Sequence, residues 1–243
     1  MFKELLRLRQ KDIVSVTGSG GKTSLLFHLS RQVPGSKVLI TSTTKIMLPE
    51  KRQYDFLHIG ADNIESFLSM QQSGRYVLGK SLDTSKGKLI GFEPETLSAY
   101  TGYFDICLIE SDGSRQKPLK GWNETEPVIL PASTKTIGVI NLKLIGQYAS
   151  ERNVHQLNHF IALLSSPFMG IVAASHIKDI ILHEKGLFKD AVGEKILFIN
   201  QADEQTHLDA ALSFLAGFSS NELDIFYAVI IGSVKRNRSL AIK

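Results

Sequence analysis

The chain has 243 residues, of which 43% are hydrophobic, and 28 Lys and Arg against 24 Asp and Glu give a net charge of +4. This length suits one large domain, and the hydrophobic content is enough for a sizeable core, which excludes a disordered scaffold. The 19 Gly and 7 Pro follow no period, which excludes fibrous and low-complexity proteins. The mild positive charge favours anionic ligands, but blocks of Lys or Arg that would indicate nucleic-acid binding are missing. We therefore expect a single domain over residues 1–243 that does not bind nucleic acid.

Three features predict a cytoplasmic protein without a membrane segment. The one cysteine, Cys107, lies within an apolar run, so no internal disulfide can form and the thiol is expected in the core. The amino-terminal segment is too charged to resemble a secretory signal. The longest apolar stretch, residues 161–174, contains Ser-Ser-Pro and is shorter than the roughly 18 residues of a membrane span.

The first half of the chain alternates between strand and helix patterns. After a short first helix, the β-branched residues 13–16 predict a strand, and Leu25, Leu26 and Leu29 then follow a helical period. A second strand is expected at residues 37–41, after the helix stop Pro34-Gly35. Weaker patterns predict strands at 56–59, 75–78 and 88–92 and helices at 63–71 and 95–103.

The second half begins with a strand that is apolar until it meets an acid, residues 105–110, which is typical of a strand buried on both faces. A long polar loop at about 111–131 follows, and loops of this length usually have a function. Further strands are expected at 136–140, 195–199 and 225–231, with helices near 154–164, 176–183 and 204–215. Alternating strands and helices predict an α/β fold, a mainly parallel, doubly wound sheet flanked by helices and similar to P-loop NTPases.

A glycine loop stands between the first strand and the next helix. Phosphate binds to the backbone N–H groups of such a loop, where glycine permits unusual backbone angles and close approach. In the pattern G-x-x-x-x-G-K-[ST] the lysine reaches the β- and γ-phosphates and the hydroxyl contacts Mg²⁺. Val16 replaces the first glycine here, yet the flanking strand and helix favour an NTP site over a small-residue turn with a solvated lysine. The residues predicted to bind nucleotide are Gly18, Ser19, Gly20, Gly21, Lys22, Thr23 and Ser24.

Two acids follow the strand at 105–110, namely Glu110 and Asp112. Magnesium at a phosphate loop is held by the loop hydroxyl and by an acid at the end of a neighbouring strand. We expect Thr23, Glu110 and Asp112 to bind Mg²⁺, with Lys22, Glu110 and Asp112 as catalytic residues, because residues two apart on a strand face the same side. The alternative is that Asp112 belongs to a turn and that only Glu110 acts.

Two further segments are expected at the ligand edge of the sheet. Thr43, Thr44 and Lys45 follow the second strand, where they could contact the γ-phosphate; alternatively, the two hydroxyls cap the next helix. In the polar loop, Arg115, Lys117 and Lys120 are expected to close over the phosphates or over another anion, with Lys120 as a nucleotide-binding residue.

Asn200-Gln-Ala-Asp203 follows the strand at 195–199, at the place where guanine-reading P-loop proteins carry Asn-Lys-x-Asp. Asn200 and Asp203 are therefore candidates for binding a guanine base, and the competing reading is a helix cap. Gln201 replaces the lysine of the pattern. The histidines, including His155, are not arranged as a zinc site and are expected in the core or on the surface.

These segments together resemble the YqeC family, described as accessory proteins of selenium-dependent hydroxylases. The chain departs from the family pattern at Gly121-Trp122, Thr125 and Gln201. The resemblance covers nearly the whole chain and rests on residues 16–23, 39–45, 110–113, 118–120, 126–129 and 153–155 and on Asn200 with Asp203.

The resemblance implies a role in the maturation of molybdenum hydroxylases, with such a hydroxylase or one of its cofactor-maturation proteins as the partner. From the residues themselves we expect a Mg²⁺-dependent protein that binds and hydrolyses ATP or GTP, or a phosphoryl or nucleotidyl transferase. Two alternatives stay open. One is a non-hydrolytic, nucleotide-dependent switch or chaperone. The other is an ATP-dependent ligase, because the loop is also similar to that of Mur-type ligases, although 243 residues leave little room for their extra domains.

Overall fold

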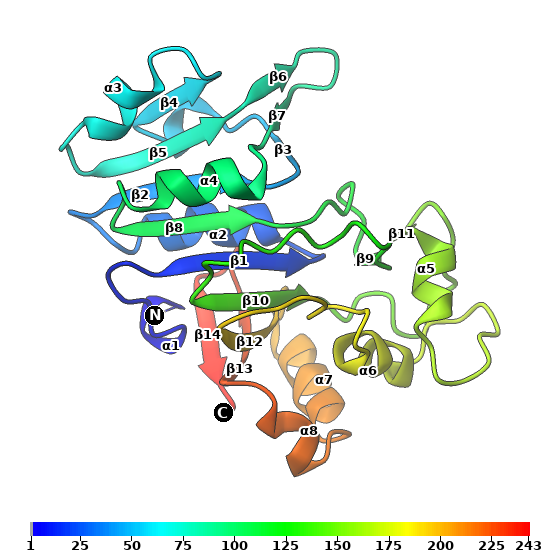
Figure 1. Ribbon diagram of the computed structural model, residues 1–243. Coiled ribbons are helices and arrows are strands. Elements are labelled where there is room, and N and C mark those ends of the chain that lie inside the picture. Colours follow the sequence, from blue (N-terminus) through cyan, green and yellow to red (C-terminus); the bar gives the residue numbers. More distant parts are fainter. Residues whose placement is uncertain (1) are drawn as a thin grey trace.

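A nine-stranded β-sheet runs through the computed structural model, which describes residues 2–243 (Figure 1). Its strands are β1 (Ile13–Gly18), β2 (Lys37–Ser42), β4 (Phe56–Ile59), β5 (Gly74–Gly79), β8 (Ile106–Glu110), β10 (Lys135–Ile140), β12 (Glu194–Ile199), β13 (Ala228–Ser233) and β14 (Arg238–Ala241). Their spatial order is β14-β13-β12-β10-β1-β8-β2-β5-β4. Every neighbouring pair is parallel except β13 with β14. The predicted α/β fold with a mainly parallel sheet is confirmed.

Eight α-helices and two small sheets complete the described part of the chain, residues 2–243. The helices are α1 (Phe2–Leu5), α2 (Lys22–Ser30), α3 (Ile64–Ser69), α4 (Pro94–Thr101), α5 (Leu157–Ala162), α6 (Ala174–Leu182), α7 (Gln205–Leu215) and α8 (Ser220–Asp224), with a 3-10 turn at Lys51–Gln53. The small sheets are β3 (Lys45–Met47) with β6 (Ser81–Asp83) and β7 (Lys88–Ile90), and β9 (Leu119–Lys120) with β11 (Val154–His155). None of these helices is long and apolar enough to cross a membrane.

Helices cover both faces of the sheet because the central strands are apolar on both sides. In β2, Val38 and Ile40 share a core cluster with Leu25 of α2, whereas Leu39 between them packs into another cluster with Leu97 of α4. Figure 1 shows α2 and α4 on opposite faces of the sheet. Alternate side chains of one strand thus anchor helices on two sides, as expected for strands that read as continuous apolar runs.

The parallel strands direct their carboxyl ends to one edge of the sheet. The loop after β1, Glu110 at the end of β8, Thr43 after β2 and Asn200 after β12 all leave the sheet there. In open α/β sheets ligands bind at this edge. The fold therefore gathers the predicted site residues from segments that are far apart in the sequence.

Several elements differ from the sequence prediction. The strand at 88–90 lies in the small sheet with β3 and β6, and the polar loop at 111–131 contains β9, which pairs with β11. As a result, the helix expected at 154–164 begins only at Leu157. The last parallel strand begins at Ala228 and not at 225. Strands β3, β6 and β14 and helix α8 were not expected, because elements this short carry little periodicity of their own.

Candidate functional site

The glycine loop forms a row of free hydrogen-bond donors at the start of α2. Gly20 and Gly21 have φ values of +90° and +124°, which a residue with a β-carbon rarely adopts. Within residues 2–243, the backbone N–H groups from Gly20 to Ser24 donate to no other protein group. These donors lie at the positive end of the helix dipole, so the loop offers an anion five unpaired N–H groups in succession.

Lys22 is held beneath this loop by backbone and carboxylate oxygens. Its side chain is buried, and Nζ donates to the Gly18 carbonyl at 2.6 Å. Nζ also lies 3.2 Å from Asp112 Oδ1 and 3.6 Å from Glu110 Oε1. Burial acts to lower the pKa of Lys22, but Asp112 and Glu110 outweigh it and the pKa is raised. The ammonium is therefore charged and close to any phosphate bound by the loop.

Thr23 and Glu110 form an oxygen pair beside the loop. Thr23 Oγ1 donates to Glu110 Oε2 at 2.5 Å, and Glu110 is only 6% exposed at the end of β8. Burial raises the pKa of Glu110, opposed by Lys22 and Thr23. No cluster of three or more His, Cys, Asp or Glu suited to a metal occurs in residues 2–243. One carboxylate and one hydroxyl still fit Mg²⁺, which keeps water and phosphate oxygens among its ligands.

Asp112 lies under the loop and does not line the cavity. It is completely buried, and it accepts hydrogen bonds from Gly18 N at 3.0 Å, Thr17 Oγ1 at 2.9 Å and Trp122 Nε1 at 2.7 Å. Lys120 Nζ is 3.0 Å away. Burial acts to raise the pKa of Asp112, but Lys120 and then Lys22 lower it to about 2. The structure thus differs from the prediction that Asp112 faces the ligand, because buried donors from β1 and from the polar segment surround its carboxylate and it does not line the cavity.

Lys120 also differs from its predicted role. It is 0% exposed and does not line the cavity, and its Nζ pairs with Asp112 and with Glu126 Oε2 at 2.9 Å. It is therefore part of the support of the loop and does not face the cavity. Arg115 and Lys117 of the same polar segment do line the cavity, as expected of residues that could close over an anion.

Thr43 and Thr44 line the cavity beside Glu110. Thr43 donates its hydroxyl to the Val128 carbonyl at 2.7 Å, and its backbone N–H donates to the Glu110 carbonyl at 3.1 Å. The alternative that these hydroxyls cap a helix is wrong, because strand β3 follows them. Ser24 also lines the cavity, whereas the buried Ser19 donates to the Pro118 carbonyl at 2.9 Å.

The Asn200 segment supports the loop from the other side. Asn200 Nδ2 and Gln201 Nε2 donate to the Gly20 carbonyl at 2.8 and 3.0 Å. Asp203 accepts a hydrogen bond from Ser233 Oγ and is not the cap of α7, which begins after Glu204. Asn200 thus supports the glycine loop, and the helix-cap alternative does not apply to Asp203.

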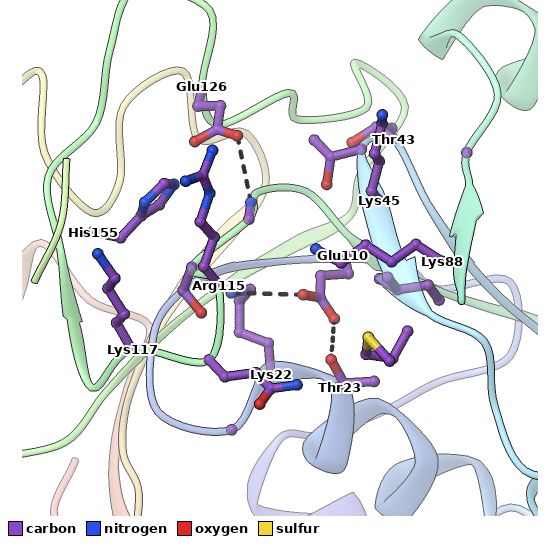
Figure 2. Close-up of a pocket in the computed structure, with 18 of the residues that line it drawn as sticks. Lys22, Thr23, Thr43, Lys45, Lys88, Glu110, Arg115, Lys117, Glu126 and His155 are labelled. Carbon is purple, nitrogen blue, oxygen red and sulfur yellow. Dashed lines mark hydrogen bonds and ion pairs between the residues drawn. The ribbon is translucent and has the colours of Figure 1, made fainter. Parts of the chain in front are cut away.

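These parts surround a cavity of about 1440 Å³ at the carboxyl edge of the sheet (Figure 2). The loop lies against one side of it, and β3, β7 and the 113–118 segment line the rest. His155 lines it too, with a pKa lowered to about 4 by burial and then by Lys120, so its ring is neutral near pH 7. Sequence reasoning missed His155, although it lies in a segment that carried the family resemblance. It also missed Lys88 and Trp122, which no local pattern marks as functional.

The sequence of this site matches one known family. The model of the YqeC protein family matches residues 14–158, which is more than half of the chain. The chain belongs to the YqeC family. The YqeC match includes the glycine loop, Glu110 and His155 and ends before Asn200. The resemblance noted in the sequence is therefore confirmed at the level of the family.

One curated relative matches over nearly the full length. A protein of Escherichia coli (strain K12), described as "Uncharacterized protein YqeC", is 28% identical to this chain over 239 residues, which cover 96% of this chain and 91% of the relative. No solved structure matches the chain. The match to the YqeC relative extends past the region of the family model and includes the Asn200 segment.

Proposed function

We propose that this chain is a Mg²⁺-dependent nucleotide-binding protein of the P-loop type that hydrolyses ATP or GTP. The observation that carries the proposal is the row of free N–H groups from Gly20 to Ser24, with Lys22 and Thr23 in the same turn. Donors that are already in place do not have to reorganise when charge develops on a phosphoryl group. Glu110 supports the proposal, because it puts a carboxylate next to the loop hydroxyl.

Each residue has a distinct part in this proposal. The loop N–H groups and Lys22 would bind the β- and γ-phosphates, and Lys22 would exchange the Gly18 carbonyl for a phosphate oxygen. Thr23 and Glu110 would hold Mg²⁺, which compensates phosphate charge when it is bound. Asp112 would act as a positioning residue, because it binds the Gly18 N–H and Lys22 without reaching the cavity.

The base preference belongs to the same proposal. Ser233 holds Asp203 Oδ1, and Oδ2 has no hydrogen-bond partner within residues 2–243. A carboxylate fixed in this way could accept from the N1 and N2 hydrogens of guanine. We therefore expect GTP to bind more tightly than ATP, and Asp203→Ala to remove that difference while both nucleotides still bind.

Thermal unfolding with ATP, GTP and their diphosphates, with and without Mg²⁺, tests the proposal. A ligand at about 100 times its Kd stabilises the native state by roughly 2.7 kcal/mol. We expect a Mg²⁺-dependent rise in Tm that is lost in Lys22→Ala and reduced in Thr23→Val, which keeps the shape but not the hydroxyl. The exposed Lys185→Ala is the matched control. Nucleotide binding and hydrolysis by Lys22→Ala at the level of the parent would contradict the proposal.

A second candidate is a non-hydrolytic switch, and the buried acids favour it. Both Glu110 and Asp112 are within ion-pair distance of Lys22, so neither is free to activate water. Nucleotide state would then set the affinity for a partner, which by the family resemblance is a molybdenum hydroxylase or one of its maturation proteins. Single-turnover hydrolysis combined with partner capture that differs between triphosphate and diphosphate would favour the switch. Multiple turnovers would favour the NTPase.

A further inference from the structure

The cavity is larger than one bound nucleotide requires. Its volume is about 1440 Å³, whereas pockets for one small molecule typically measure roughly 300–1,000 Å³. The phosphate loop lies against one side, and the small sheet of β3 and β7 lines another. Space next to the proposed phosphate site is therefore available for a second molecule.

The charges in the cavity are unbalanced. Three glutamates line it, and each pairs with a lysine, namely Glu93 with Lys80, Glu110 with Lys22, and Glu126 with Lys120. Within residues 2–243, every lysine and arginine that lines it except Lys22 forms no ion pair; these are Lys45, Lys86, Lys88, Arg115, Lys117 and Lys143. A Mg²⁺-bound triphosphate carries fewer negative charges than this, since the metal cancels two of them. The excess positive charge points to a second anion.

The strand register assigns two of these lysines to one surface. In the antiparallel pair, Lys45 lies opposite Ile90 and Met47 lies opposite Lys88, so all four side chains share a face. That face lines the cavity. Between them, Ile46 and its partner Leu89 point to the other face and are 2% and 1% exposed. The apolar anchors fix the strands, so the two ammonium groups are presented by a rigid surface.

This wall, Lys45 and Lys88 on β3 and β7, lies next to the proposed γ-phosphate position. Lys45 comes two residues after Thr43, whose N–H donates to the Glu110 carbonyl. In Figure 2, Lys45 and Lys88 are on the opposite side of Glu110 from His155 and Lys117. The end of β7 is also pressed against β2, since a β-carbon on Gly91 would be 1.6 Å from the Ser42 carbonyl oxygen.

We propose that the Lys45–Lys88 wall binds a second anionic ligand, a small molecule that carries a phosphate group, beside the terminal phosphate of the nucleotide. The inference rests on the proposed nucleotide site and deepens it, because it gives the protein a second substrate or effector. On β6, Asp83 lies opposite Lys88 in the strand register. Its carboxylate accepts a hydrogen bond from the Ser85 hydroxyl and forms no ion pair within the described residues. Lys45 acts on the Asp83 carboxylate only from beyond ion-pair distance, so neither lysine is held in an ion pair within residues 2–243.

Isothermal titration calorimetry tests the second site with inorganic phosphate as the probe. The chain is first saturated with Mg²⁺ and a non-hydrolysable triphosphate, at a concentration at which the rise in Tm no longer increases. We expect parent protein to bind phosphate saturably and Lys45→Ala/Lys88→Ala to bind it at least about tenfold more weakly, because two charge-assisted contacts are lost. Lys51→Ala/Lys185→Ala removes the same charge from exposed positions outside the cavity and should match the parent.

The outcomes separate this inference from the proposed function. Phosphate binding by Lys45→Ala/Lys88→Ala that equals the parent's, or no phosphate binding by the nucleotide-saturated parent, overturns the second site. Failure of every nucleotide to raise the Tm overturns the proposed function instead. In that case, phosphate binding that still depends on Lys45 and Lys88 would leave the basic wall as an anion site in its own right.

Discussion

At Asp112, donors from distant parts of the chain meet on one carboxylate. Thr17 and Gly18 come from β1, whereas Lys120 and Trp122 come from the polar segment after β8. A carboxylate that accepts several hydrogen bonds beside ammonium groups is strongly favoured in its charged form, which accounts for the pKa of about 2. The conformation of the glycine loop therefore depends on this buried side chain.

The first prediction concerns the charge of Asp112. Asp112→Asn keeps the shape but removes the charge that compensates Lys22 and Lys120, which are both buried. Breaking a buried pair in this way costs about 3–5 kcal/mol, so we expect a loss of this order in the free energy of unfolding, measured in urea. Asp62→Asn, at an exposed position, is the control. A loss below about 1 kcal/mol would show that the network does not hold the loop.

The second prediction concerns pH and His155. Burial, followed by Lys120, lowers its pKa to about 4 in the folded state. The unfolded chain binds this proton near the ordinary pKa of about 6.5, so protonation favours unfolding, and this contribution to stability is lost as pH falls from about 6.5 towards 4. We expect His155→Gln to flatten the pH dependence of the unfolding free energy in this window. His28, whose pKa burial also lowers, remains in both proteins and contributes equally. An unchanged slope would refute the assignment to His155.

Among the elements, the turn from β1 into α2 is constrained from two sides. Asn200 and Gln201 hold the Gly20 carbonyl, and Asn141 lies so close that a β-carbon on Gly20 would be 2.3 Å from its Nδ2. Asn141 is itself fixed, because it donates to the Pro118 carbonyl at 2.7 Å. The loop thus has no room to change shape, and its N–H groups are already arranged for an anion.

The third prediction uses two glycines with similar backbone angles. Gly20 has φ +90° and is packed against Asn141, whereas Gly146 has φ +81° and nothing within 4 Å of a β-carbon. Alanine at either position adds about 1–3 kcal/mol of backbone strain. Only Gly20→Ala also displaces the donors, so we expect it to abolish the nucleotide-dependent rise in Tm, while Gly146→Ala retains it. An equal rise in Tm in both variants would show that nucleotide binding does not depend on the N–H groups of the loop.

At the scale of the whole molecule, the central sheet links the three core clusters. The cluster on the α2 side includes Val16 and Ile40, the cluster on the α4 side includes Leu39, and the cluster under α6 and α7 includes Leu197. Neighbouring strands contribute to more than one cluster. Unfolding of one cluster would therefore expose strands whose other residues pack into the remaining clusters.

The fourth prediction is that the chain unfolds in one cooperative transition. Trp122 is the one tryptophan and lies beside Asp112 at the site, so its fluorescence reports on the loop region. Far-UV circular dichroism reports on all helices and strands. Coincident midpoints in urea are expected for a single domain. Two separated midpoints would show that the part after β10 folds as a unit of its own.

Predictions from the sequence succeeded where the chemistry is contiguous and failed where it is not. Gly20, Gly21, Lys22 and Thr23 lie in one segment, so their pattern alone predicted the loop. The role of Asp112 could not be predicted from its spacing to Glu110, because it is decided by Trp122 and Lys120 folding back on it. Strands β9 and β11 could not be predicted for the same reason, since each is only two residues long and is defined by its pairing with the other.

The sequence by itself determined the α/β class, the glycine loop and the YqeC family, because apolar periodicity and a local motif are properties of neighbouring residues. The tertiary structure decided which polar residues face the cavity. In the folded chain, Lys120 and Asn200 support the loop, and Lys88 and His155 line the cavity. Such roles depend on contacts between residues as far apart as Gly20 and Asn200, and only the packing of the sheet brings these together.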